Sequence, residues 1–332
     1  MKVIRAIIFF VHIFVVLMLL GTMLNNYIPP KIFAGFNLLS LAFPILIIVH
    51  FLLIVFWIIS WKKRAFAFLF LTLLMLNPIK RWVNFSSKSK EEANLKLLSF
   101  NVKGGVMGVD QVMEYLKSQD ADVVLLQESN LGDQKILKQS GYHHYQISPI
   151  VEMYTKHKVV GNKQLIASSL DVNSYSDYHD IKINDQTYRF INVYLQPFQF
   201  EKSMVKLNGN SEQDEQKVKN ILRRLIPTFK DHQDQVKLIR KGIDDSPYPI
   251  FLMGDFNAVP SSYEYYNLGN GLKDVFTEVG NGSATSFHDY KFPLRIDYVF
   301  TSKEIEPISY TIDRDVKLSD HFPVITEFKI KR

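Results

Sequence analysis

The stretch from Ile250 to Pro260 holds the residues most able to do chemistry. The apolar run 250–253 is typical of a buried strand, and it is followed by Gly254-Asp255-Phe256-Asn257 before Pro260 breaks it. Polar groups at the carboxyl end of a buried strand lie where open α/β sheets place their sites. Asp255 and Asn257 are two residues apart, so in an extended chain both side chains project to the same side. A carboxylate beside a carboxamide suits a phosphate oxygen and the water that attacks it, although a capped turn is the commoner interpretation of this stretch alone.

Further polar side chains lie at the ends of other apolar runs. They are Asn101 after 97–100, Glu128 after 123–127, Asp297 within 294–300, and Asp320 and His321 before 322–325. A charged residue among such large apolar neighbours is costly unless it is paired or bound to a metal. One such residue is common. Several at successive strand ends predict convergence on a single site.

These positions require a sheet whose strand ends meet. We predict strands at 95–102, 122–127, 164–170, 187–195, 249–253, 295–300 and 322–330. Helices are predicted at 109–119, at 133–139 and from about 211 to 241, the last interrupted or kinked by Pro227. The alternation of strands and helices predicts an α/β domain with helix layers over sheet.

The motifs resemble those of the endonuclease/exonuclease/phosphatase superfamily, the deoxyribonuclease I-like metal-dependent phosphoesterases. Five short motifs occur in the order of that family over roughly residues 95–330: Ser99-Phe100-Asn101, Gln127-Glu128, Gly254-Asp255-Phe256-Asn257, Arg295-Ile296-Asp297-Tyr298 and Ser319-Asp320-His321. The resemblance implies a four-layer α/β/β/α sandwich, in which two packed mixed sheets are flanked by helices and the site lies at one edge.

The resemblance also implies a metal site. Glu128 resembles the principal ligand of Mg²⁺ or Mn²⁺, hard cations that take carboxylate and water oxygens. Asn101 would orient that shell or a phosphate oxygen, and Asp320 would supply a further carboxylate.

Catalytic roles follow from the same resemblance. Asp255 resembles the group that orients or deprotonates the attacking water, and Asn257 would hold a phosphate oxygen. Asp297 would hydrogen-bond one ring nitrogen of His321 and fix its tautomer, leaving the other nitrogen to face the phosphate. Asn192 and Arg295, which lie in matching segments, are assigned to substrate binding.

The sequence departs from the family pattern at two positions. Family members often carry a His after an Asn-x pair at the end of a central strand, and here Tyr194 follows Asn192-Val193. A phenol can donate a hydrogen bond to phosphate, but with a pKa near 10 it is no cationic acid at neutral pH. Lys103 stands where the abasic-site endonucleases have an acidic residue, which argues against that branch.

Residues 1–83 are predicted to form about three transmembrane helices, at 3–24, 36–60 and 64–79. The first has no small-residue cleavage site, and further apolar segments follow it, which favours a membrane helix over a signal peptide. The cations of Lys2, Arg5 and Lys62-Lys63-Arg64 favour the cytoplasmic side of an inner-membrane-type bilayer. We therefore expect a linker at 84–94 and, with three spans, an extracytoplasmic catalytic domain at 95–332; a failed third span would reverse this topology.

The amino-acid composition restricts the kinds of site and of binding partner that the chain can have. The chain has no cysteine, which excludes disulfides, thiolate zinc sites and a cysteine nucleophile. Residues 1–90 hold ten of the 39 Lys and Arg residues and none of the 33 Asp and Glu residues, so the remainder has 29 basic against 33 acidic side chains. The net charge of +6 thus belongs to the membrane-flanking segment and gives no basic footprint for non-specific DNA binding.

Two functions remain open on the sequence. The first is a membrane-anchored, divalent-metal-dependent phosphoesterase acting on nucleic acid or on a lipid or small organophosphate. The second is a catalytically silent, membrane-tethered binding module of the same fold, which Tyr194 favours and the intact acidic residues and His321 oppose. No protein partner is indicated.

Overall fold

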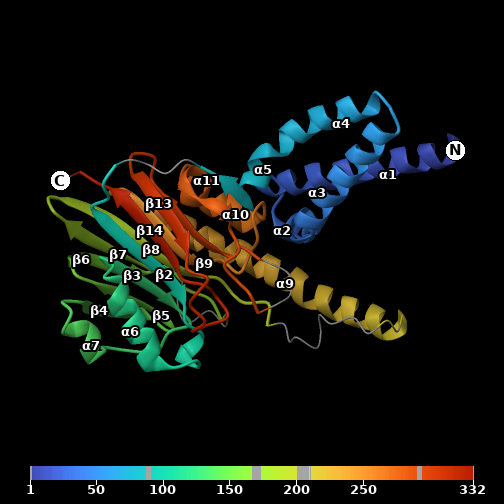
Figure 1. Ribbon diagram of the computed structural model, residues 1–332. Helices are drawn as coiled ribbons and strands as arrows, with labels where there is room; N and C mark the ends of the chain where they lie inside the picture. Colours follow the sequence, from blue (N-terminus) through green and yellow to red (C-terminus); the bar gives the residue numbers. More distant parts are fainter. Residues whose placement is uncertain are drawn as a thin grey trace.

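The computed structural model describes residues 2–86, 91–166, 173–199, 209, 211–289 and 294–331. A body of two stacked sheets lies at one end, and a bundle of N-terminal helices extends from it (Figure 1). The long helix α9 runs along the body and projects beyond it on the side of the bundle (Figure 1).

Each sheet has six strands, in the orders β13-β14-β2-β3-β5-β4 and β10-β12-β9-β8-β7-β6. The pairs β2/β3 and β8/β9 are parallel and the other pairs are antiparallel, so both sheets are mixed, as predicted. The first sheet comprises β2 (Leu95–Asn101), β3 (Val123–Gln127), β4 (His143–Ser148), β5 (Val151–Thr155), β13 (Glu306–Ile312) and β14 (Val324–Lys329). The second comprises β6 (Lys158–Gln164), β7 (Tyr175–Ile183), β8 (Gln186–Tyr194), β9 (Ile250–Asp255), β10 (Lys273–Asp274) and β12 (Asp297–Thr301).

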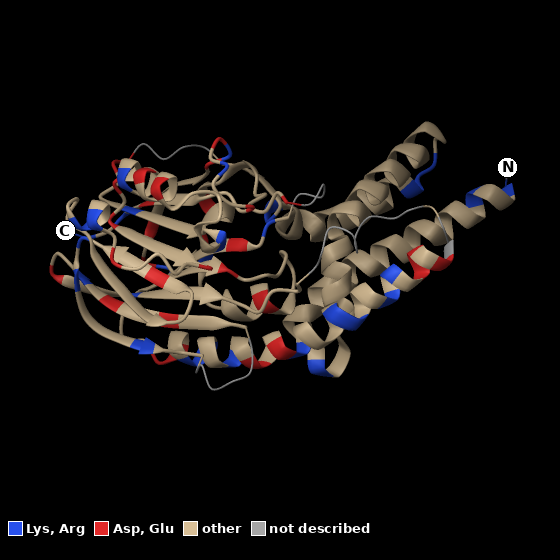
Figure 2. Cartoon of the chain, turned by 90° about the horizontal axis from the view of Figure 1, so that it is seen from below, with Lys and Arg blue, Asp and Glu red and all other residues tan. Residues whose placement is uncertain are grey.

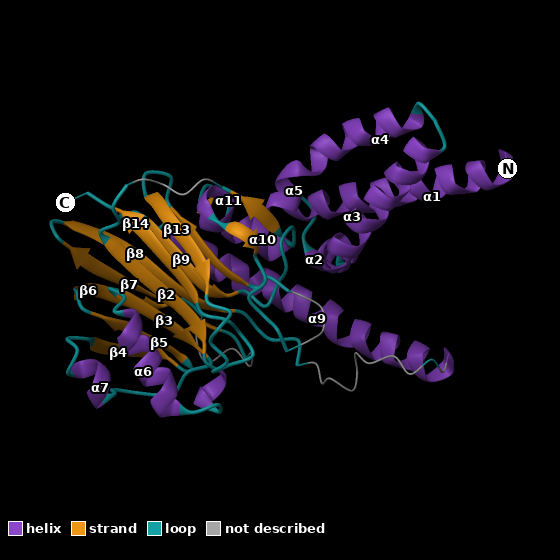
Figure 3. Cartoon of the chain, in the orientation of Figure 1, coloured by secondary structure: helices purple, strands orange, loops and turns teal. Residues whose placement is uncertain are grey.

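The core lies between the sheets, and helices cover their outer faces (Figure 3). Leu97 of β2 belongs to the core between the sheets, whereas its neighbour Leu98 belongs to a cluster with Leu116 of α6 (Val109–Gln119). Because both faces of the strand are buried, adjacent positions such as Leu97 and Leu98 are both apolar and strict alternation is lost. The remaining helices of the body are α7 (Lys135–Lys138), α9 (Ser211–Asp244), α10 (Tyr263–Leu268) and α11 (Val275–Val279). The predicted four-layer sandwich is confirmed.

Two predicted elements need correction. The strand expected at 164–170 is wrong for its described part, because β6 ends at Gln164 and a bend follows; residues 167–170 lie outside the described part of the chain. β6 is an edge strand of mixed polarity, and its register shifts between Val159 and Gly161. Its sequence therefore lacks the regular alternation of apolar and polar residues that predicts a strand. Pro227 does not interrupt α9, which is one helix from Ser211 to Asp244.

The N-terminal bundle contains α1 (Lys2–Gly21), α2 (Pro30–Phe33), α3 (Gly35–Ile59), α4 (Arg64–Thr72) and α5 (Leu76–Lys80). Two segments, Lys2–Asn26 and Gly35–Ile59, are long and apolar enough to cross a membrane. The third predicted span is shorter and is divided by a 3-10 turn at Leu73–Met75.

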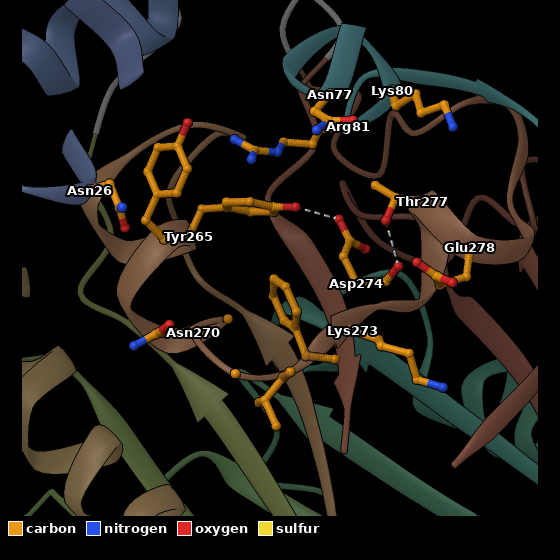
Figure 4. Close-up of a pocket in the computed structure, with 15 residues that line it drawn as sticks. Asn26, Asn77, Lys80, Arg81, Tyr265, Asn270, Lys273, Asp274, Thr277 and Glu278 are labelled. Atoms are coloured by element: carbon orange, nitrogen blue, oxygen red, sulfur yellow. Dashed lines mark hydrogen bonds between the residues drawn. The ribbon is translucent and has the colours of Figure 1, made fainter. Parts of the chain in front are cut away.

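The bundle is hydrogen-bonded directly to the body. Asn37 of α3 donates to both carboxylate oxygens of Glu264 at 3.2 and 3.0 Å and accepts from the Tyr263 N–H at 2.8 Å. The Arg81 guanidinium lies 4.6 Å from the rings of both Tyr265 and Tyr266, at the polar cavity drawn in Figure 4. These contacts attach α3 and the turn after α5 to the same surface of the body.

The predicted linker at 84–94 begins inside a strand. β1 (Val83–Phe85) pairs with β11 (Asn281–Ser283), and buried Asn84 donates to the carbonyl oxygens of Phe276 and Thr277 at 3.0 Å each. Residues 87–90 lie outside the described part of the chain. The chain is therefore held against the body as soon as it leaves the bundle.

Candidate active site

Strand ends from both sheets bring the predicted residues together. Asn101 ends β2, Glu128 follows β3, Tyr194 ends β8 and Asp255 ends β9. Asp297 begins β12 directly opposite Asp255 in the ladder between β12 and β9. Because β2 and β3 are parallel to each other, as are β8 and β9, their carboxyl ends meet at one edge of the sandwich.

The backbone at this edge is strained at several points. Glu128, Lys103 and Asn257 have positive φ angles of 46°, 47° and 45°. Gly254 has a φ of +137°, and a Cβ there would lie 2.1 Å from the Val193 carbonyl oxygen, so only glycine lets β9 approach β8 this closely. Strain of this kind concentrates at functional sites, where it sets the direction of a side chain.

His321 lies between two buried carboxylates. Its Nδ1 is 2.9 Å from Asp297 Oδ2 and its Nε2 is 3.7 Å from Asp255 Oδ2. Burial opposes the imidazolium, but Asp297 and Asp255 together raise the pKa of His321 well above its ordinary value. Burial likewise raises the pKa of Asp255, although the nearby imidazolium opposes this. A cationic donor and a carboxylate of raised basicity thus lie side by side.

Asn101 connects the two carboxylates on either side of it. Its Nδ2 donates to Glu128 Oε1 and to Asp255 Oδ2, at 3.0 Å each, and its Oδ1 accepts from the Lys103 N–H at 3.0 Å. Tyr194 OH donates to the same Glu128 oxygen at 3.1 Å. Burial and the charge of Glu128 raise the pKa of Tyr194, which keeps the phenol protonated as a donor.

The position predicted for a cation faces several carboxylates. The ammonium of Lys103 forms an ion pair with Asp320. Burial opposes the ammonium, but Asp320, Asp289 and Glu128 raise the pKa of Lys103 above its ordinary value. Positive charge is thus favoured between Glu128 and Asp320, whose oxygen donors fit Mg²⁺ or Mn²⁺. Sequence reasoning treated Lys103 only as a departure from the family pattern.

A second possible cation position is less suitable. Ligand atoms of Asp255, Asp297 and His321 lie within 4.8 Å of one another. Asp297 and His321 are joined by a hydrogen bond of 2.9 Å. A histidine that binds a metal must be neutral, so His321 would have to lose the proton that makes it a cation. The raised pKa of His321 opposes that loss.

Asn257 is held beside Asp255. Its backbone N–H donates to Asp255 Oδ1 at 2.8 Å, and its Nδ2 donates to the Leu195 carbonyl oxygen at 2.8 Å. Asn257, Glu128, Asp320 and His321 line one cavity of about 470 Å³. The polar groups therefore face a space large enough for part of a substrate.

Two predicted substrate-binding residues lie away from this cavity lining. Asn192 is buried between the sheets, where it accepts from Gln127 at 2.7 Å and donates to the Leu126 carbonyl oxygen at 3.0 Å. Arg295 is fully buried, and its guanidinium donates to Asp274 at 2.8 and 2.6 Å. Figure 4 shows Tyr265 directed at the same Asp274, with an OH-to-Oδ2 distance of 2.8 Å. The geometry gives both residues structural roles in place of the expected substrate contacts.

Comparison with known proteins agrees with this geometry. The sequence profile of the Endonuclease/Exonuclease/phosphatase family matches residues 98–321, so the chain belongs to that family. A second profile, a domain of unknown function (DUF8431), matches residues 5–82. Comparison with curated protein sequences gives no significant match.

Solved structures share the fold at low sequence identity. A humanized TDP2 from D. rerio is 16% identical, with a TM-score of 0.52 over 71% of this chain and 99% of that one. The 3′ phosphatase NExo from Neisseria, bound to a product DNA hairpin, is 19% identical, with a TM-score of 0.50 over 71% and 100% of the two chains. An AP endonuclease from Archaeoglobus fulgidus gives the same four values. Family and fold together support a phosphoric ester hydrolase.

Proposed function

We propose that the chain is a membrane-anchored, divalent-metal-dependent phosphoesterase. The observation that carries the proposal is the Asp297–His321–Asp255 arrangement beside Glu128 and Asp320 at one edge of the sandwich. An acid, a base and oxygen ligands for a cation are the groups that in-line attack of water on phosphorus requires.

Each group has a defined task. Asp255 orients the attacking water and takes its proton, which its burial-raised pKa favours. His321, held by Asp297, donates from Nε2 to a phosphoryl oxygen. Tyr194 supplies a neutral donor. Glu128 and Asp320 would hold Mg²⁺ or Mn²⁺, which when bound neutralises phosphate charge and polarises the water.

The arrangement of the bundle supports membrane anchoring and an extracytoplasmic body. The N-terminus and the loop between α3 and α4 lie at the end of the bundle away from the sheets (Figure 1). Lys2, Arg5, Lys62, Lys63 and Arg64 belong to these two segments, and the ribbon is blue there in Figure 2, which marks Lys and Arg. Because cations that flank membrane helices favour the cytoplasmic side, we take this end as cytoplasmic and propose that the body lies on the other side.

Hydrolysis of bis(4-nitrophenyl) phosphate by the purified full-length chain in lipid nanodiscs tests the activity. We expect turnover with Mg²⁺ or Mn²⁺ that EDTA abolishes and that readdition of metal restores. Asp255→Asn and His321→Asn should each lower kcat by about 10²-fold or more, because each removes a proton-transfer group. Asp245→Asn, at an exposed carboxylate, is the matched control. Absence of turnover with every phosphate ester would favour the silent binding module.

The proposed membrane topology is tested separately, by labelling of introduced cysteines. Because the chain lacks cysteine, a single introduced thiol is unique. In right-side-out vesicles, a membrane-impermeant maleimide should label Asp245→Cys in the body and leave Lys62→Cys unlabelled. The reverse pattern would place the body in the cytoplasm.

A further inference from the structure

The cavity at the polar site continues along a groove between two helices. Asn37, Leu41 and Ile45 of α3 line one side, and Ile221, Leu225 and Phe229 of α9 line the other. Each set has a spacing of four residues, which places its members on one face of their helix. The stripe on α3 extends over eight residue steps, a length of about 12 Å.

Apart from Asn37, the residues of the two stripes form one apolar surface. Leu225 and Phe229 pack against Ala34 at the start of α3, and half-buried Leu41 and Ile221 pack around them. At the far end of the α3 stripe, Ile45 is 55% exposed and lies within a helix long enough to cross a membrane. The groove thus runs from a membrane-length helix to Glu128, Asp320 and His321.

The lining also discriminates among phosphate esters. Among the described residues that line this cavity, none is Lys or Arg. Nucleic-acid backbones are held by such side chains, which neutralise successive phosphates. An apolar groove instead gains affinity from each methylene that it buries, about fourfold per group. The surface therefore suits a single phosphate attached to hydrocarbon.

We propose that the substrate is a lipid phosphoester, with its phosphate at Asp255 and His321 and its hydrocarbon chain in the groove between α3 and α9. This inference rests on the proposed phosphoesterase function and names its substrate class. In the reaction, water oxygen forms a new bond to phosphorus while the bond from phosphorus to the ester oxygen breaks. The ester oxygen keeps the bonding electrons and takes up a proton, and the attacking water loses one.

A series of 4-nitrophenyl alkyl phosphates tests the groove, because only the chain length changes from methyl through butyl to octyl. The full-length chain in nanodiscs, with Mg²⁺ or Mn²⁺, should show kcat/KM rising on the order of 100-fold or more from the methyl to the octyl ester. KM should fall while kcat stays level, because the chain contributes equally to binding of the ground state and the transition state.

Two variants obstruct the groove and one leaves it intact. Leu41→Trp fills it and Ile221→Asn makes its wall polar; each should remove most of the octyl preference, measured as the ratio of octyl-ester to methyl-ester kcat/KM. Val218→Asn changes an exposed residue of α9 and should behave as the unaltered chain. Partition of octyl ester into the bilayer affects all variants alike, and methyl-ester turnover reports folding of each.

The outcomes separate the two proposals. No octyl preference in the unaltered chain, its persistence in both groove variants, or a higher kcat/KM for an oligonucleotide would overturn the lipid assignment and leave the phosphoesterase standing. Failure of the unaltered chain to hydrolyse any ester in the series would overturn the phosphoesterase itself, and with it the substrate assignment.

Discussion

Replacing Arg295 by Met separates a structural role of this guanidinium from a substrate-binding role. Arg295 is fully buried, and both terminal nitrogens donate to Asp274. Removing one partner of a buried ion pair costs about 3–5 kcal/mol, because the other charge is left uncompensated. Tyr265 OH and the Phe276 N–H would still donate to Asp274, so we expect the lower end of that range, about 3 kcal/mol.

That loss is large enough to measure. At about 2–4 °C per kcal/mol for a domain of this size, Tm of the full-length chain in nanodiscs should fall by roughly 6–12 °C, followed by tryptophan fluorescence. The double variant Arg295→Met/Asp274→Asn removes both charges and should recover most of the loss. Arg314→Met, at an exposed arginine, is the control. If Arg295→Met leaves Tm unchanged and raises KM, the guanidinium contacts substrate and the structural assignment fails.

Three further substitutions test the site and the core. Asp297→Asn keeps the side-chain shape but removes the charge facing His321; we expect kcat for bis(4-nitrophenyl) phosphate to fall about 10²–10⁴-fold with little change in KM. Burial raises the pKa of Asp177 to about 8, so the folded state keeps a proton that the unfolded state releases above its ordinary pKa near 3.8. Stability is therefore lost as pH rises from about 4 to about 8, and Asp177→Asn should raise Tm more at pH 8 than at pH 5. Gly254→Ala would place Cβ 2.1 Å from the Val193 carbonyl oxygen, so we expect the folded protein to be lost or Tm to fall steeply.

Each of these three predictions would be contradicted by a specific result. A fall in kcat below threefold for Asp297→Asn would mean that His321 needs no carboxylate partner. Equal Tm shifts at both pH values would mean that Asp177 is ionised in the folded state. Gly271→Ala is matched to Gly254→Ala, because its φ is +79° but its Cβ would meet nothing within 4 Å. It should cost only about 1–2 kcal/mol, and equal losses in the two glycine variants would refute the close-contact argument.

The sequence predicts the central strands and the convergence of the site well. Strands buried on both faces, such as β3 and β9, appear as uninterrupted apolar runs, and the acidic residue that follows β3 (Glu128) or ends β9 (Asp255) is the one brought to the site. Strands with interior polar residues are harder to predict. β7 carries Asp177, Asp180 and His179 within its nine residues, so periodicity gives no clear signal.

Other features depend on tertiary contacts that no local pattern contains. Arg295 lies two residues before Asp297 and would share its side in an extended chain, but β12 begins only at Asp297, so the alternation does not reach Arg295. Its partner Asp274 is 21 residues away. The groove pairs α3 with α9, and the ion pair of Lys103 with Asp320 joins residues separated by 217 positions. Such pairings are fixed only when the whole chain is folded.

The double attachment of the body through Asn37 and Arg81 limits how the enzyme can search for its target. A domain on one flexible tether sweeps a volume and samples esters in solution. A domain attached at two points of the helical bundle cannot rotate freely. In a bilayer, the opening of its cavity would therefore keep a fixed distance from the membrane and a fixed orientation. Encounters would then come from lateral diffusion in the surrounding leaflet, and turnover would follow the density of ester per unit area of membrane instead of its bulk concentration.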